Sequence, residues 1–166
     1  IGASRSSAER ATPTHRRALV TLGIMEFPHS YHARAEAGDG DVILSSGALP
    51  EIRSAPPAAF GGPGDRWSPE DLLVASVADC FALSFQAVAR ASRLAWDRLE
   101  VDVEGTLDRV GNEMRFTKIV VRPTLHVGAD VAEHQPGKVL EKAERMCLIT
   151  NSLSSEVTLE PTIVTG

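Results

Sequence analysis

The chain has 166 residues, of which 43% are hydrophobic and 23% are charged, and its formal net charge is -5. A chain of this length and composition is typical of one soluble globular domain with a sizeable core. The negative charge argues against nucleic acid and against an anionic membrane surface as partners. No apolar run approaches the ~18 residues of a transmembrane span, so no membrane partner is expected.

The chain starts with a polar stretch, "IGASRSSAERATPT". No apolar segment of about 7–15 residues follows, as a secretory signal would require. Two cysteines do not suggest a structural disulfide framework. We therefore expect a cytoplasmic protein in which residues 1–28 are a partly disordered N-terminal extension and residues 29–166 form one domain.

Two strands are predicted in residues 30–47, on either side of the turn signal "GDG". Residues 49–67 are rich in proline and glycine, so we expect mostly loop there. A loop of this length inside a domain is uncommon and is often functional.

A long helix is predicted to follow that loop. Ser68 begins an S-x-x-D capping box, and Pro69 takes the first helical position. The pattern continues to about Leu94 and is almost free of charge in its first half, which indicates a helix buried on most sides. Asp79 is the exception.

The second half of the chain begins with a predicted hairpin. "LEVDVEGTLD" alternates apolar and polar residues, as in a strand with one wet face, and "RFTKIVVRPTLHV" forms the second strand. The apolar parity switches between Phe116 and Ile119, which indicates a bulge. "GKVLEKAERMC" is an amphipathic helix with Cys147 at its apolar end, and "EVTLEPTIV" is a closing strand in which Pro161 marks an edge or a bulge. This order predicts an α+β fold with two helices packed on a largely antiparallel sheet.

Cys80, in the middle of the long helix, has two interpretations. Free cysteine is commonly a small buried hydrophobe, and apolar burial makes a thiol inert. A reactive Cys80 needs a cation or hydrogen-bond donors nearby, and Asp79 would oppose the thiolate if it pointed at the sulfur. Cys147 has the same two interpretations. If the two thiols meet, one can be oxidised to a sulfenic acid and the other can condense with it to a disulfide.

Glu70 is the third candidate. At the second helical position it either complements the helix dipole or orients a cation or a substrate. Other signals are weak: His29 and His32 would face opposite ways on a strand, and "GGPGD" lacks the lysine of a phosphate loop. We therefore predict no metal site and no cofactor.

Two motifs resemble those of the OsmC/Ohr family. "WSPEDLLVASVADCFALSFQAVA" is similar to the family's N-P-E-x-L helix, which ends in A-C-F, and "AERMCLITNSL" is similar to its A-x-x-x-C-P-x-S-N motif. The resemblance covers roughly residues 31–164, with both motifs in the expected order. It implies an OsmC-like fold and an intertwined homodimer with active sites near the subunit interface.

The resemblance also implies an activity and roles for three residues. Cys80 would be the peroxidatic thiol, Cys147 the resolving thiol, and Glu70 the carboxylate that holds an arginine over the thiolate. The reaction would be the reduction of organic hydroperoxides and peroxide. A dithiol would restore the enzyme, and lipoylated proteins are implicated as reductants in the Ohr branch.

The family arginine is missing from its two usual positions, which are Gly38 and Ala59 in this chain. Arg34, Arg53 and Arg66 are the candidates for its replacement, and no motif selects one. Two further departures are Asp79 before the first cysteine and Leu148 in place of the proline after the second.

We therefore expect a cysteine-based peroxidase. The alternative is a non-peroxidatic member that binds an apolar small molecule at the dimer interface. A third possibility is a stress-induced structural or interaction protein without a site.

Overall fold

The structure is a computed structural model in which residues 27–166 are described. The chain divides into two units, residues 1–32 and residues 33–166. Of the first unit only residues 27–32 are described, and they contain no helix or strand; the rings of Phe27 and His29 meet edge to face at 5.0 Å. The expected extension, residues 1–28, therefore lies almost entirely outside the described residues.

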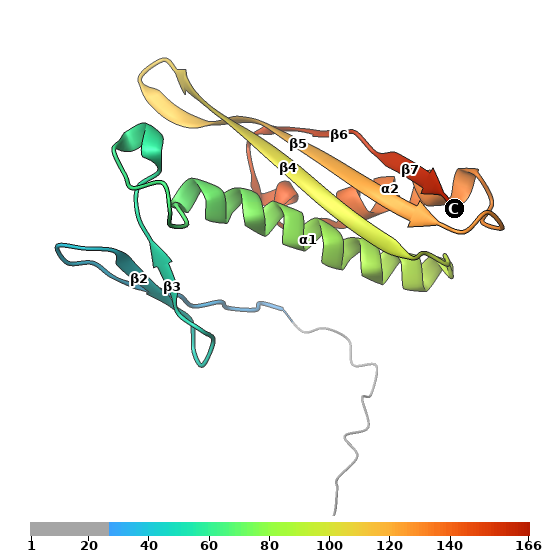
Figure 1. The fold of residues 1–166 in the computed structure, drawn as a ribbon, viewed down its shortest axis with the longest axis horizontal. Coiled ribbons are helices and arrows are strands. Elements are labelled where there is room, and N and C mark those ends of the chain that lie inside the picture. Colours follow the sequence, from blue (N-terminus) through green and yellow to red (C-terminus); the bar gives the residue numbers. More distant parts are fainter. Residues whose placement is uncertain (1–26) are drawn as a thin grey trace, which may run out of the picture. The chain divides into compact units, whose positions relative to one another are not determined.

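The second unit begins with a three-stranded antiparallel sheet in the order β1-β2-β3 (Figure 1). Its strands are β1 (Arg34–Glu36), β2 (Val42–Ser45) and β3 (Ile52–Ser54). The two strands predicted around "GDG" are confirmed. β3 and a short 3-10 helix, Ala58–Phe60, lie in the segment that we expected to be mostly loop. Three residues are too short a run to give a strand pattern.

Helix α1 (Pro69–Ser92) begins as predicted. The Ser68 hydroxyl accepts a hydrogen bond from the Asp71 N–H at 3.1 Å, and the Asp71 carboxylate accepts one from the Ser68 N–H at 3.0 Å. These two bonds form the predicted capping box. The helix ends where Arg93 takes a left-handed conformation, at φ 53°.

Helix α1 is also long and apolar enough to cross a membrane, with a mean hydropathy of 1.8 over its most apolar 18-residue window. The expectation that no apolar stretch approaches this length is therefore wrong. That expectation was based on an unbroken apolar run, and Asp79 interrupts that run. An average over 18 residues stays high in spite of one charged residue. Core helices of globular proteins pass the same test, and only 28% of this window is buried in the protomer.

The predicted hairpin is formed by β4 (Arg98–Val110) and β5 (Glu113–Val127), which pair antiparallel. The register shifts at Thr106/Leu107: Thr106 faces Lys118 and Leu107 faces Phe116. The extra residue on β5 is the predicted bulge.

The last elements are α2 (His134–Met146), β6 (Glu156–Leu159) and β7 (Thr162–Thr165). Both strands pair with β5 in parallel, so this sheet is mixed, although its longest pairing, β4 with β5, is antiparallel as predicted. The predicted closing strand is broken at Pro161, which has no N–H for the ladder.

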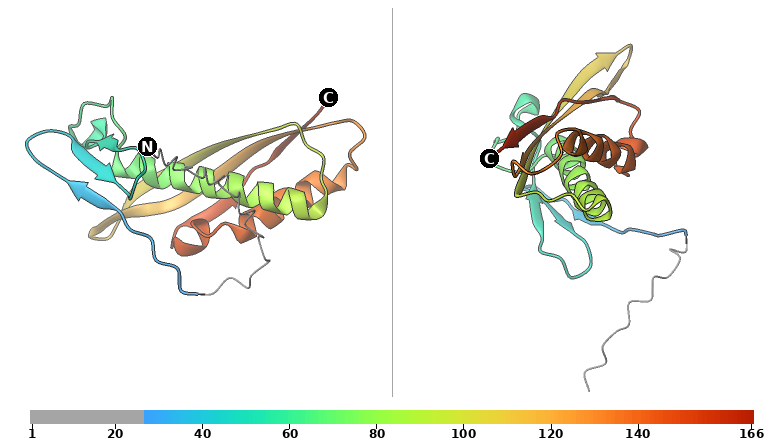
Figure 2. Two further views of the ribbon diagram at one scale, coloured as in Figure 1. Left: turned by 90° about the horizontal axis from the view of Figure 1, so that it is seen from below. Right: turned by 90° about the vertical axis from the view of Figure 1, so that its right-hand side faces the viewer.

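Both helices pack on one face of this second sheet, and the core lies between them and β5 (Figure 2). Its largest fully buried side chains come from α1, β5 and α2, and they include Phe81, Phe85, Ile119, Leu125 and Leu140. The α+β class predicted from the sequence is confirmed.

Candidate functional site

The two cysteines lie where α1 and α2 pack together. Cys80 is half-buried on α1, between the buried core residues Val77 and Phe81. Cys147 follows the last residue of α2 and is fully buried. Both are free thiols, and they interact directly although 67 positions separate them in the chain. The packing of α1 against the apolar face of α2 therefore brings the two predicted thiols together.

The pKa of the Cys147 thiol is raised above its ordinary value, mainly because burial disfavours the thiolate. Hydrogen bonds from Thr150 act in the opposite direction, and the neighbouring Cys80 raises the pKa further. Thr150 is itself buried, and its hydroxyl donates a hydrogen bond to the carbonyl oxygen of Cys147 at 3.1 Å. Cys147 is thus a protonated, shielded thiol beside a more accessible one.

Thr150 was missed in the sequence analysis. It lies three residues after Cys147, across a turn that leads into a short 3-10 helix, Thr150–Ser152. A hydroxyl three residues beyond a cysteine is a signal that could have been noticed, because such turns bring the two side chains close.

Asp79 does not oppose Cys80 directly. Consecutive residues on an α-helix point about 100° apart. Asp79 is accordingly exposed whereas Cys80 is half-buried. Within residues 27–166 the Asp79 carboxylate forms no ion pair.

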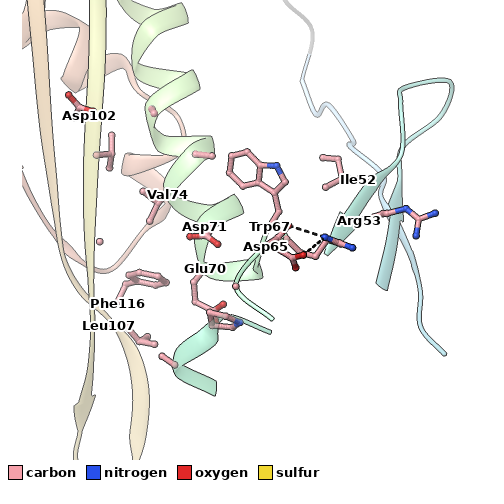
Figure 3. A pocket seen from close by; sticks show the side chains of 18 of the residues that line it. Ile52, Arg53, Asp65, Trp67, Glu70, Asp71, Val74, Asp102, Leu107 and Phe116 are labelled. Carbon is pink, nitrogen blue, oxygen red and sulfur yellow. Dashed lines mark hydrogen bonds and ion pairs between the residues drawn. The ribbon is translucent and has the colours of Figure 1, made fainter. Parts of the chain in front are cut away.

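Glu70 lies at the N-terminus of α1, on the wall of an open cleft of about 1180 Å³ (Figure 3). Helix α1 and the segment before it form one wall, with Trp67 and Asp71; β4 and β5 form another, with Leu107 and Phe116. The Oε2 atom of Glu70 is buried and has no hydrogen-bond partner within the described residues. A buried carboxylate oxygen without a donor is costly, so this position calls for one.

Glu70 and Cys80 are not brought together within one protomer. Ten residues separate them, which corresponds to about 15 Å along an α-helix. Cys80 also does not line the cleft; Ala78 does, and residues two apart on a helix face different ways. The three predicted site residues therefore form one pair of thiols and one separate carboxylate.

The cleft contains two of the three candidate arginines. Arg66 is held by Asp41 at 3.0 Å and by Asp65 at 2.9 Å, and both carboxylates raise its pKa. Arg53 has only a long contact to Asp41, at 3.8 Å, and its side chain is 70% exposed. Arg34 pairs with Glu36 and does not line the cleft. Arg53 is the less engaged of the two cations that line the cleft.

Comparisons with known proteins identify relatives of the chain. Residues 62–162 match the family model described as OsmC-like protein. An uncharacterized protein of Bacillus subtilis, YmaD, is 25% identical over 107 residues, which are 63% of this chain and 71% of the relative. An uncharacterized protein of Methanocaldococcus jannaschii, MJ0573, is 24% identical over 113 residues, which are 66% of this chain and 58% of the relative.

Solved structures share the fold. An OsmC-like protein of unknown function from Vibrio cholerae, VCA0330, has a TM-score of 0.72 at 18% identity and covers 81% of this chain and 99% of its own. Organic hydroperoxide resistance proteins from Legionella pneumophila and Elizabethkingia anophelis have TM-scores of 0.64 and 0.69 at 22% and 19% identity. They cover 83% and 86% of this chain and 98% and 100% of their own. With a family match across most of the second unit and this shared fold, the chain belongs to the OsmC-like protein family.

Proposed function

We propose that the chain is a thiol-dependent peroxidase that reduces organic hydroperoxides, and peroxide itself. The observation that carries the proposal is the pair of interacting free thiols, one half-buried on α1 and one buried after α2. Two structural neighbours of the chain are organic hydroperoxide resistance proteins, which supports the same reaction class.

The difference in exposure supports the two proposed roles. The Cys80 thiolate attacks the terminal oxygen of the hydroperoxide; the O–O bond breaks, the alkoxide takes a proton to leave as the alcohol, and Cys80 becomes a sulfenic acid. The sulfur of Cys147 then attacks the sulfur of Cys80, forming a disulfide and releasing water. A dithiol reductant exchanges with that disulfide, becomes oxidised itself and restores both thiols. The buried Cys147 is shielded from bulky peroxides, which suits the resolving role.

A second copy of the chain would complete the site. Exposed apolar side chains lie close in sequence to the two cysteines: Leu83 is 56% exposed, Met146 49% and Leu148 73%. Exposed apolar side chains, where they gather, are typical of a protein interface. The proposed homodimer would bring Glu70 and Arg53 of one copy to Cys80 of the other, where a guanidinium would favour the thiolate.

The test is turnover of cumene hydroperoxide with dihydrolipoamide or dithiothreitol as the reductant. Cys80→Ser should abolish turnover. Cys147→Ser should still form one sulfenic acid per chain, detected by dimedone labelling, but should fail to form the disulfide. Unchanged turnover in Cys80→Ser contradicts the proposal.

The same assay tests the choice of arginine. Arg53→Met should lower the second-order rate constant for Cys80 oxidation, since it removes the cation that favours the thiolate. Arg66→Met is the matched control, because Arg66 is already neutralised by two carboxylates. Equal effects of the two substitutions would contradict the assignment of Arg53.

A non-peroxidatic binding protein is the second candidate. It is favoured by the absence of a basic hydrogen-bond partner for Cys80 within the described residues. The rate of Cys80 alkylation against pH separates the two functions. A thiol pKa well below about 8.5 indicates the peroxidase, and a higher value with slow alkylation indicates the binding protein.

A further inference from the structure

A second cavity, of about 460 Å³, lies between the first sheet and the N-terminus of α1. Its volume is within the range of about 300–1,000 Å³ that is typical of small-molecule sites. The residues that line it are almost all apolar: Ala35, Val42, Leu44, Ser54, Ala55, Pro56, Pro57, Phe60, Pro69, Glu70 and Leu72.

The sequence of the first sheet explains why this cavity is apolar. Directly paired residues of neighbouring strands share a face of the sheet. Ala35 pairs with Leu44, and Val42 pairs with Ser54, so these four side chains lie on one face. The charged side chains of the sheet, Arg34, Glu36 and Arg53, belong to the opposite set of pairs.

Among residues 27–166, Glu70 is the only ionisable residue that lines this cavity, and it also lines the larger cleft. Its Oε2 atom is buried and has no hydrogen-bond partner within residues 27–166. Arg66, on the same segment of chain, is already paired with Asp41 and Asp65. A carboxylate oxygen left without a donor at an apolar wall favours a ligand that supplies one.

We propose that this cavity binds an apolar small molecule with one hydrogen-bond donor at its end, of which a primary amine is the best match. The amine would donate to Glu70 Oε2, and its hydrocarbon body would pack against Leu44, Phe60 and Leu72. An alcohol of the same chain length would bind more weakly, because it carries no charge to pair with the carboxylate. A fatty acid would be rejected, because two carboxylates would repel each other.

The experiment uses 1-aminoanthracene as a fluorescent probe and three competitors of equal chain length: octylamine, octan-1-ol and octanoate. Octylamine should displace the probe at a concentration at least about tenfold lower than octanoate, with octan-1-ol between them. Absence of probe binding, or equal displacement by the amine and the carboxylate, would overturn the proposal. This comparison on the unmodified chain decides the question even if a variant fails to fold.

Two variants locate the site. Glu70→Gln should weaken octylamine binding at least about tenfold and leave octan-1-ol nearly unchanged. Glu51→Gln is the matched control, because Glu51 lines the cleft and not this cavity. Ala35→Phe should fill the cavity and lower the affinity for all three competitors. If Glu70→Gln and Glu51→Gln behave alike, the assignment to Glu70 is wrong.

The binding assay needs no peroxidase turnover, although the amine site and the proposed peroxidase site share Glu70. Repeating the titration with Cys80→Ser should give the same affinities, because Cys80 does not line the cavity. A failed peroxidase assay with intact probe binding would refute the proposed function alone. An active peroxidase that binds no probe would refute this inference alone.

Discussion

The two cysteines differ in one property that the sequence did not reveal, which is their exposure. Both fall on apolar stripes, so periodicity predicts burial for each. In the structure Cys80 lies at the edge of the core face of α1 and is half-buried, whereas Cys147 is fully buried beside Thr150. This difference gives each thiol a separate role in the proposed cycle.

Thr150 should set the pH dependence of disulfide formation. Its hydrogen bonds lower a Cys147 pKa that burial raises. Thr150→Val removes the hydroxyl, so the pKa should rise further and the pH–rate curve should move to higher pH. At neutral pH the disulfide should form about three- to tenfold more slowly after one equivalent of cumene hydroperoxide.

This rate is measured by counting the free thiols as a function of time after rapid mixing with the hydroperoxide. Ser152→Ala is the control, because Ser152 is exposed, donates to the Leu148 carbonyl and does not contribute to the pKa shift of Cys147. A curve for Thr150→Val that coincides with the unmodified one would show that the hydroxyl does not act on Cys147.

At the scale of elements, the predictions were confirmed where a local sequence pattern decides the structure. The capping box fixed the start of α1, and the change of apolar parity located the bulge in β5. Two features of the fold were not predicted from the sequence. β3 is too short to show a period, and the parallel direction of β6 and β7 depends on how the chain crosses over through α2, which no local pattern encodes.

Gly105 allows β4 to approach α1 closely. A Cβ atom at this position would lie 2.7 Å from Phe116 Cε1 and 2.9 Å from Val74 Cγ2, which is too close. Gly105→Ala should therefore lower the free energy of unfolding by about 1–2 kcal/mol, measured by urea denaturation. Gly38→Ala is the control, since nothing lies within 4 Å of its added Cβ, and it should change the stability little. If Gly105→Ala were as stable as Gly38→Ala, Phe116 would have to move into the cleft at no cost in free energy.

At the scale of the whole molecule, two surfaces of the protomer are left without a packing or pairing partner. Within residues 27–166 β4 pairs only with β5, so its other edge is open. Exposed strand edges are normally covered or protected. Helix α1 is highly apolar, and yet most of its residues are half-buried or exposed. Both observations favour the proposed homodimer.

Leu83→Glu should weaken that homodimer. A charge placed in an apolar interface is costly, and the dissociation constant should rise about 100-fold or more. Sedimentation velocity measures the change, and peroxidase turnover should fall with it. Met114→Glu is the control, because Met114 is equally apolar and 60% exposed but lies beside the hairpin turn. A Leu83→Glu protein that stays dimeric would place the interface elsewhere.

The bulge in β5 has a consequence for how the family can change length. Thr117 is the residue without a partner on β4. Removing Thr117 would leave a regular ladder between β4 and β5, in which Phe116 still pairs with Leu107. Paired residues share a face of the sheet, so the Phe116 side chain would stay on the same side. Deletion of Thr117 should therefore be tolerated. Deletion of Val120 would instead move every side chain between this position and the hairpin turn to the opposite face of the sheet. Natural relatives that differ in length within this strand should therefore differ at Thr117.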